Sequence, residues 1–234
     1  MNIKNFSTII NGSIVRGDTS LVGDTLNVIC LHGGGVRGRV GFRKIREMLS
    51  DKRISSCAFD YKGHGETGGE LLSTSLKEKV EQTISVIDSE KIKKPLTIIA
   101  SSMGGYVAIK MTELYDVKNL ILIAPAVYSK EAYQISFGSE FSSIIRKPFS
   151  WLNSDVWEIL KKYTGNIIIY KAGNDQIIPE DVIKKIYDST VNAKKREVIT
   201  IKKATHPLTD WFDEHSDDLD LAIETMSKLI LKSK

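Results

Sequence analysis

The 234-residue sequence predicts an α/β domain with a mostly parallel sheet, on the strength of two observations. First, short apolar runs, which are typical of strands buried on both faces, alternate with stretches of helical periodicity. Second, glycines and polar residues stand directly after these runs, and the carboxyl ends of parallel strands are where such a sheet carries its functional groups. The expected strands span residues 27–31, 57–59, 95–100, 120–124, 167–170 and 198–201.

An antiparallel hairpin is expected ahead of this sheet, because Asn11-Gly12 separates two apolar runs, 6–10 and 13–15. Helical spacing then follows most of the strands. A last helix is expected to have Ser216 as its N-cap, with acidic residues in its first turn, where the helix dipole favours anions. The other expected helices span about 42–49, 75–87, 155–162 and 179–187, with a further one beginning just after Gly105.

Residues 126–163 interrupt this alternation with many aromatic residues and a single expected helix. We therefore divide the chain into a core, formed by 1–125 and 164–234, and a small insertion, formed by 126–163. The aromatic residues of the insertion could pack it onto the sheet or line a pocket, and the sequence favours neither role. The candidates for lining a pocket are Tyr128, Phe137, Phe141, Trp151 and Trp157.

Composition argues against several classes of protein. The net charge is +4, but the lysines are dispersed without a basic stripe or interleaved aromatic residues, which argues against nucleic-acid binding. No apolar run is long enough for a membrane-spanning helix, and the first residues lack the features of a secretory signal. Both cysteines, Cys30 and Cys57, fall in expected buried strands, as in a reduced cytoplasmic protein.

The segment 98–105, Ile-Ile-Ala-Ser-Ser-Met-Gly-Gly, carries the main functional signal. It is close to the pattern G-x-S-x-G, in which a serine sits at a sharp turn between a strand and a helix with its hydroxyl exposed. Ser102 is in register, because Gly104 follows it by two residues. Ala100 stands where the pattern has its first glycine, so one methyl group must fit beside the helix.

A serine hydroxyl needs a general base to become a nucleophile at neutral pH. His206, after the last expected strand, is the candidate base, and Asp175 is the candidate partner that would fix its tautomer. His215 is a rival to His206, but its polar neighbours are typical of a solvated helix start. Backbone N–H groups of Gly34 and Met103 are the candidate oxyanion hole.

Five motifs occur in the chain order typical of one family. They are Leu31-His32-Gly33-Gly34, the D-x-x-G-H-G loop 60–65, the serine turn, the acid loop 172–179 and the segment 204–207 around His206. With them the chain resembles the α/β-hydrolase family, especially bacterial carboxylesterases, monoacylglycerol lipases and cinnamoyl-type esterases. The resemblance implies an enzyme that cleaves a carboxylic ester or thioester of a short or medium acyl or aryl acid through an acyl-enzyme, with no metal or organic cofactor. It also implies that the insertion 126–163 forms a small cap.

Other interpretations remain open at this point. Acyl transfer and amide hydrolysis use the same triad. The spacing Gly33-x-Gly35-x-x-Gly38, with Asp60 about 20 residues further on, matches a dinucleotide-binding fingerprint, although that reading leaves Ser102 unexplained. A non-catalytic binding module is a further possibility. His32 and His64 are expected to be structural hydrogen-bonding residues beside glycine turns, and the oligomeric state is not predicted.

Overall fold

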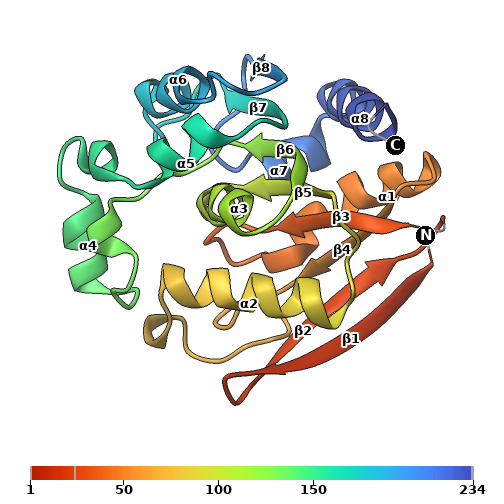
Figure 1. Cartoon of the computed structure of the whole chain (residues 1–234), viewed down its shortest axis with the longest axis horizontal. Coiled ribbons are helices and arrows are strands. Elements are labelled where there is room, and N and C mark those ends of the chain that lie inside the picture. The colour runs from red at the N-terminus through yellow and green to blue at the C-terminus, as the bar shows by residue number, and fades with distance from the viewer. Residues whose placement is uncertain (1, 24, 233–234) are drawn as a thin grey trace.

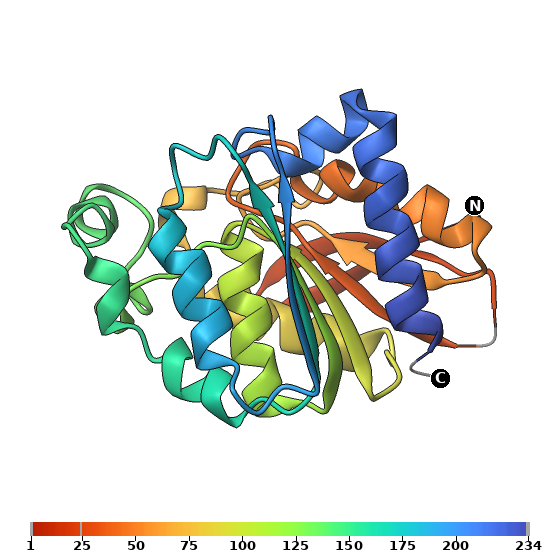
Figure 2. The ribbon, with the colours of Figure 1, turned by 90° about the horizontal axis from the view of Figure 1, so that it is seen from above.

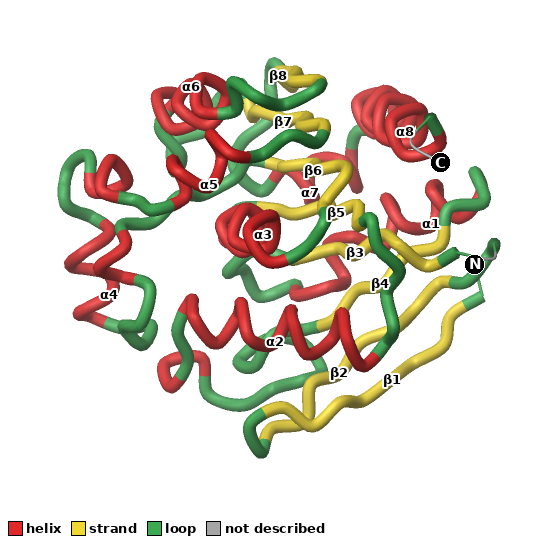
Figure 3. Tube along the Cα trace, viewed as in Figure 1, coloured by secondary structure: helices red, strands yellow, loops and turns green. Residues whose placement is uncertain are grey.

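The computed structural model describes residues 2–23 and 25–232. Within these residues, eight strands form one twisted sheet in the order β1-β2-β4-β3-β5-β6-β7-β8 (Figures 1 and 3). Every pairing from β4 to β8 is parallel, whereas β1 and β2 are antiparallel, which confirms the predicted α/β class with a mostly parallel sheet. The strands are β1 (Ile3–Ile10), β2 (Ser13–Ser20), β3 (Leu26–Leu31), β4 (Ser55–Phe59), β5 (Leu96–Ser101), β6 (Val117–Ile123), β7 (Asn166–Ala172) and β8 (Lys195–Ile201).

Helices cover both faces of the sheet, as the view along its edge shows (Figure 2). On one face lie α2 (Leu76–Ser89), α3 (Met103–Leu114), α5 (Val156–Lys162) and α6 (Glu180–Ser189). On the other lie α1 (Arg43–Asp51), α7 (Leu208–Glu214) and α8 (Ser216–Leu231). Successive residues of β3 alternate between the two apolar cores, because side chains of a strand point to opposite faces: Ile29 and Leu31 join one, and Val28 and Cys30 the other.

The expected hairpin is confirmed and is longer than predicted. Asn11 and Gly12, which join β1 to β2, both have positive φ, at 48° and 76°, as a two-residue turn matching the twist of a hairpin requires. The expected helices are also found. One detail was wrong: His215 is the N-cap residue of α8, and Ser216 is its first helical residue without a capping side-chain bond. Asp217 and Asp218 do lie in the first turn.

The segment between β6 and β7 stands away from the sheet beside α3 (Figures 1 and 2). It contains the 3-10 turns η3 (Lys130–Ala132) and η4 (Ser150–Asn153), helix α4 (Ser139–Ile145) and helix α5. Its first half is tied to the start of α2, since the Lys77 N–H donates to the Tyr133 carbonyl (3.0 Å) and the Phe137 N–H donates to the Thr74 carbonyl (2.8 Å). Among the described helices, none is long and apolar enough to cross a membrane.

Candidate active site

Ser102 occupies the turn between β5 and α3. Its backbone has φ 48° and ψ −116°, a conformation that costs a non-glycine residue energy and that recurs at functional turns. Surrounding bonds hold the turn: the Ser102 N–H donates to the Ile123 carbonyl (3.0 Å), and the Gly105 N–H donates to the Ser102 carbonyl (2.9 Å). Strand and helix approach so closely that a Cβ on Gly104 would overlap the Leu31 carbonyl. The buried Ala100 does fit in β5.

The structure brings Ser102, His206 and Asp175 together from three different loops. His206 Nε2 lies 3.0 Å from Ser102 Oγ, and His206 Nδ1 lies 2.9 Å from Asp175 Oδ2. Because a carboxylate can only accept, Nδ1 carries the proton of the neutral ring and Nε2 faces the serine hydroxyl with its lone pair. This geometry suits proton transfer from the hydroxyl to the imidazole.

The carboxylate of Asp175 is fixed by its own loop. Its Oδ1 accepts from the N–H groups of Ile177 (2.8 Å) and Ile178 (2.9 Å), so only Oδ2 faces His206. The Asp175 side chain is 8% exposed, and that of His206 is 17% exposed. The acid is therefore oriented before any substrate arrives.

A pocket of about 250 Å³ opens beside Ser102, between the glycine loop that follows β3 and the segment that carries His206. Gly34 lines it, and a Cβ built on Gly34 would lie 4.0 Å from Met103 Sδ, so the two candidate oxyanion residues are neighbours. Met103 is the first residue of α3, and helix geometry leaves its N–H without an intrahelical acceptor. Gly34 therefore borders the pocket, and the Met103 N–H follows the serine directly in the chain, so the oxyanion hole stays a prediction.

Two buried histidines hold the glycine loop from the inside. The Tyr61 N–H donates to His32 Nε2 (3.1 Å), so the His32 proton is on Nδ1, which donates to the Gly33 carbonyl (2.6 Å). Burial lowers the pKa of His32 to about 3, so the ring stays neutral. His64 Nε2 donates to the Gly34 carbonyl (3.3 Å), and burial lowers its pKa as well. The expected structural role of both residues agrees with these bonds.

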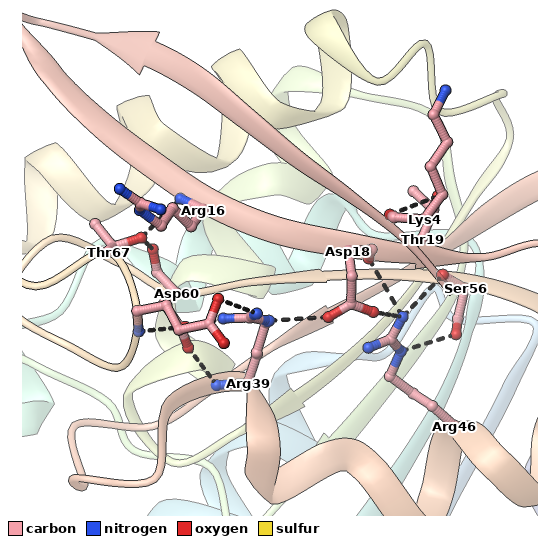
Figure 4. Close-up of polar contacts among 10 residues, drawn as sticks. Lys4, Arg16, Asp18, Thr19, Arg39, Arg46, Ser56, Asp60 and Thr67 are labelled. Carbon is pink, nitrogen blue, oxygen red and sulfur yellow. Dashed lines mark hydrogen bonds and ion pairs between the residues drawn. The ribbon is translucent and has the colours of Figure 1, made fainter. Parts of the chain in front are cut away.

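Asp60 lies in a buried ion-pair network rather than in an open site (Figure 4). It is 1% exposed and accepts from the Arg39 N–H (2.7 Å) and from the Arg39 guanidinium, which also pairs with Asp18 (2.9 Å). Arg46 bonds Asp18 from the other side (2.6 Å). A dinucleotide-binding site would need the carboxylate free for a ribose hydroxyl, whereas here an arginine of the same chain covers it.

The five aromatic candidates do not meet Ser102 at this pocket. Among the described residues that line it, none is one of the five. They pack on one another instead, with Phe137 against Phe141 at 4.8 Å between ring centroids, and Trp151 against Trp157 at 6.1 Å. Tyr128 contacts Phe141 and also Tyr106 of α3. Direct ring contacts therefore support a packing role for these aromatic residues, and their role in lining a pocket stays a prediction.

The rival histidine lies elsewhere. The His215 ring stacks on Trp211 at 3.5 Å, and its Nδ1 donates to the Trp211 carbonyl (3.0 Å). In residues 2–23 and 25–232, no group of three or more His, Cys, Asp and Glu side chains is arranged to hold a metal ion. The sequence analysis did not identify Arg37 and Asp210, which line the pocket, or Asp213, which pairs with Arg37. No local pattern joins residues so far apart in the chain.

Comparisons with known proteins give a consistent result. A family model described as "Serine aminopeptidase, S33" matches residues 25–156, which is more than half of the chain. A Mycoplasma pneumoniae protein provisionally named an esterase/lipase is 31% identical over 102 residues, but the match spans only 42% of this chain and 37% of that protein.

Solved structures resemble the whole chain. The structure of a Butyrivibrio proteoclasticus protein with ferulic acid bound has a TM-score of 0.75 and 18% identity, covering 97% of this chain and 98% of that one. A thioesterase domain from the curacin biosynthetic pathway has a TM-score of 0.71 and 16% identity, covering 99% and 100%. At these identities the likeness establishes the fold alone.

Proposed function

The chain belongs to the serine aminopeptidase S33 family of α/β hydrolases, and we propose from that premise that it is a serine hydrolase acting on a carboxylic ester or thioester. The observation that carries the proposal is the pair of contacts made by His206, 3.0 Å to Ser102 Oγ and 2.9 Å to Asp175 Oδ2. An acyl-transfer triad consists of a hydroxyl bonded to an imidazole, which is bonded in turn to a carboxylate.

In the proposed first step, Ser102 Oγ attacks the substrate carbonyl carbon while His206 Nε2 takes the hydroxyl proton. The carbonyl oxygen becomes an oxyanion, which the N–H groups of Gly34 and Met103 would hold. Asp175 stabilises the imidazolium that forms. His206 then gives the proton to the leaving alcohol or thiol, and the C–O or C–S bond breaks to leave an acyl-serine.

In the second step, water attacks the acyl-serine carbonyl, and His206 takes a proton from that water. The Ser102 ester bond breaks, the proton returns to Ser102 Oγ, and the free acid leaves. Losing one oxyanion donor typically costs roughly 3–4 kcal/mol of transition-state stabilisation. The same groups could hydrolyse an amide, and the description of the matching family as an aminopeptidase makes that the second candidate.

The substrate class is proposed from the pocket and from the proteins of similar fold. The substrates we propose carry a short or medium acyl group or an aryl acid, which the small volume of the pocket beside Ser102 and the ferulic acid bound to a protein of similar fold support. The insertion 126–163 is proposed to act as a small cap, an idea supported by its contacts with α3, where Tyr128 packs on Tyr106 and Asp155 binds Lys110. Phe137 and Phe141 remain proposed as acyl contacts in a substrate-bound cap.

The test is labelling with a fluorophosphonate probe, which reacts with activated serines, followed by mass spectrometry of the modified peptide. Ser101→Ala is a matched control, because Ser101 is adjacent and lines the same pocket. The expected result is one adduct on Ser102, retained in Ser101→Ala and lost in Ser102→Ala and His206→Ala. No adduct on folded wild-type protein, with either a bulky or a small phosphonate, would refute the proposal.

A further inference from the structure

The glycine loop after β3 leads away from Ser102 to a wall of the pocket that includes the charged residues Arg37 and Asp210. The proposed reaction does not use these charges. Arg37 Nη1 lies 2.6 Å from Asp210 Oδ1, and Arg37 Nη2 lies 2.6 Å from Asp213 Oδ2. Arg37 belongs to the loop after β3, whereas both aspartates belong to α7, which begins two residues after His206. We call these three residues the Arg37 clasp. The clasp joins the two segments that border the pocket.

Besides the clasp residues, the side chains of Val36, Phe42, Pro207 and Thr209 and a series of glycines line the pocket. Gly33, Gly34, Gly35, Gly38 and Gly41 all line the pocket, and none of them has a side chain that could fill it. Arg37, Thr209 and Asp210 line it from the two sides of the clasp. The resulting volume of about 250 Å³ is below the roughly 300–1,000 Å³ of pockets that hold drug-sized ligands. The side chains of the clasp therefore set how far a bound group can extend.

The clasp also determines which polar groups can bind there. Both terminal nitrogens of the Arg37 guanidinium are engaged by aspartates, so the Nη1–Nη2 edge, one of the two edges that can bind a carboxylate in bidentate fashion, is already occupied. Arg37 and Asp210 line the pocket, and Asp213 and Lys44, which do not line it, complete a set of two cations and two carboxylates whose charges balance. Lys44 Nζ donates to the Asp213 carbonyl (2.5 Å) behind the clasp. This wall suits an uncharged group.

We propose that Arg37 is a specificity-determining residue. Asp210 and Asp213 hold its side chain so that it closes the pocket beside Ser102, and the ester group bound there must then be small and uncharged. This inference rests on the proposed hydrolase function of the same site and names the class of substrate it takes: an ester in which the group bound beside the glycine loop is short and carries no charge.

The clasp can be removed without endangering the fold. The side chains of Arg37, Asp210 and Asp213 are 36%, 47% and 27% exposed, and ion pairs with this much solvent contact contribute little to stability. Arg43→Ala is the matched control, since Arg43 pairs with Glu47 on α1, is 74% exposed and does not line this pocket. Thermal unfolding of each variant checks that it folds.

The experiment measures kcat/KM for two ester series in the wild type, Arg37→Ala, Asp210→Asn and Arg43→Ala. One series varies the acyl chain of p-nitrophenyl esters from acetate to octanoate, and the other varies the alcohol of acetate esters from methyl to octyl. Arg37→Ala is expected to raise the ratio of the longest to the shortest substrate at least tenfold in one series. Asp210→Asn removes one of the two negative charges that neutralise Arg37 and is expected to raise the use of the anionic p-nitrophenyl hydrogen glutarate, relative to the neutral pentanoate, several-fold.

The outcomes separate this inference from the proposed function. If the wild type cleaves esters and Ser102 is labelled, but neither series changes its length preference in folded Arg37→Ala, the inference is wrong and the proposed function stands. An equal change in Arg43→Ala would also overturn it, because the effect would then come from lost charge alone. If the wild type cleaves none of the esters and Ser102 resists labelling, both are wrong.

Discussion

Replacing Asp175 by asparagine tests the proposed triad at its carboxylate, whose side chain is 8% exposed. In the native site, Asp175 Oδ1 accepts two backbone N–H groups, from Ile177 and Ile178, and Oδ2 accepts the proton of His206 Nδ1. The asparagine carbonyl oxygen must keep the Oδ1 position, because a flipped amide would set its NH₂ group against two N–H donors. The amide NH₂ then faces His206.

A donor at that place reverses the tautomer of His206. Nδ1 must now accept, so the ring proton moves to Nε2, which lies 3.0 Å from Ser102 Oγ. A protonated Nε2 cannot take the serine proton. The same replacement in a serine protease lowers kcat by about 10⁴, which corresponds to about 5 kcal/mol of transition-state stabilisation. We expect a loss of this order, because the two N–H groups leave the amide no alternative orientation.

The assay compares kcat for p-nitrophenyl acetate and the rate of fluorophosphonate labelling in the wild type, Asp175→Asn and the control Asp188→Asn. Asp188 is paired with Lys184 on α6 and is 53% exposed, so its replacement should leave both rates unchanged. Stability should change little in Asp175→Asn, because the side chain keeps its shape. An Asp175→Asn variant within tenfold of the wild-type rate would refute the tautomer argument and the role of Asp175.

Three further predictions concern stability. Gly104→Ala should lower the free energy of unfolding by several kcal/mol in urea, because the new methyl group would overlap the Leu31 carbonyl; an unchanged midpoint would contradict this. Arg39→Ala should cost about 3–5 kcal/mol, since it leaves the carboxylate of Asp60 buried and unpaired, and a loss below 1 kcal/mol would refute that reasoning. Burial lowers the pKa of Lys79 to about 8, below its unfolded value of about 10.5. The wild type should therefore gain roughly 3 kcal/mol relative to Lys79→Met as pH rises from 8 to 10.5, and a constant difference in urea unfolding would contradict this.

Much of the fold could be predicted because the signals involved are local. Strands buried on both faces appear as continuous apolar runs, and Ser102, Asp175 and His206 each follow such a run within five residues. Helices α4 and α7 could not be predicted in the same way. Each has seven residues, about two turns, so the apolar spacing repeats few times. Helix α5 is equally short but was predicted, since Gly165 marks its end in the sequence.

The pocket was less predictable, because its residues depend on contacts between distant parts of the chain. Arg37 meets Asp210 across more than 170 residues, and in the sequence it stands out only as a bulky residue beside a glycine turn. The aromatic residues of 126–163 illustrate the opposite problem. Their abundance is a clear signal, but aromatic side chains serve equally well in packing and in binding, and only geometry separates the two uses.

Residues that contact the glycine loop after β3, more than the glycines themselves, fix the orientation of its peptide groups. A run of glycines has no side chains with which to fix its peptide planes, and its backbone is free to adopt many conformations. Here, His32 and His64 each bind one carbonyl from the inside, and Arg37 holds the far end against α7. The Tyr61 N–H makes the His32 bond directional, because it leaves Nδ1 as the only donor. The orientation of the Gly34 N–H is therefore set by residues outside the proposed catalytic triad, and His32→Ala should lower kcat while leaving KM for a short ester nearly unchanged. A drop in stability with unaltered kcat would instead mean that His32 serves packing alone.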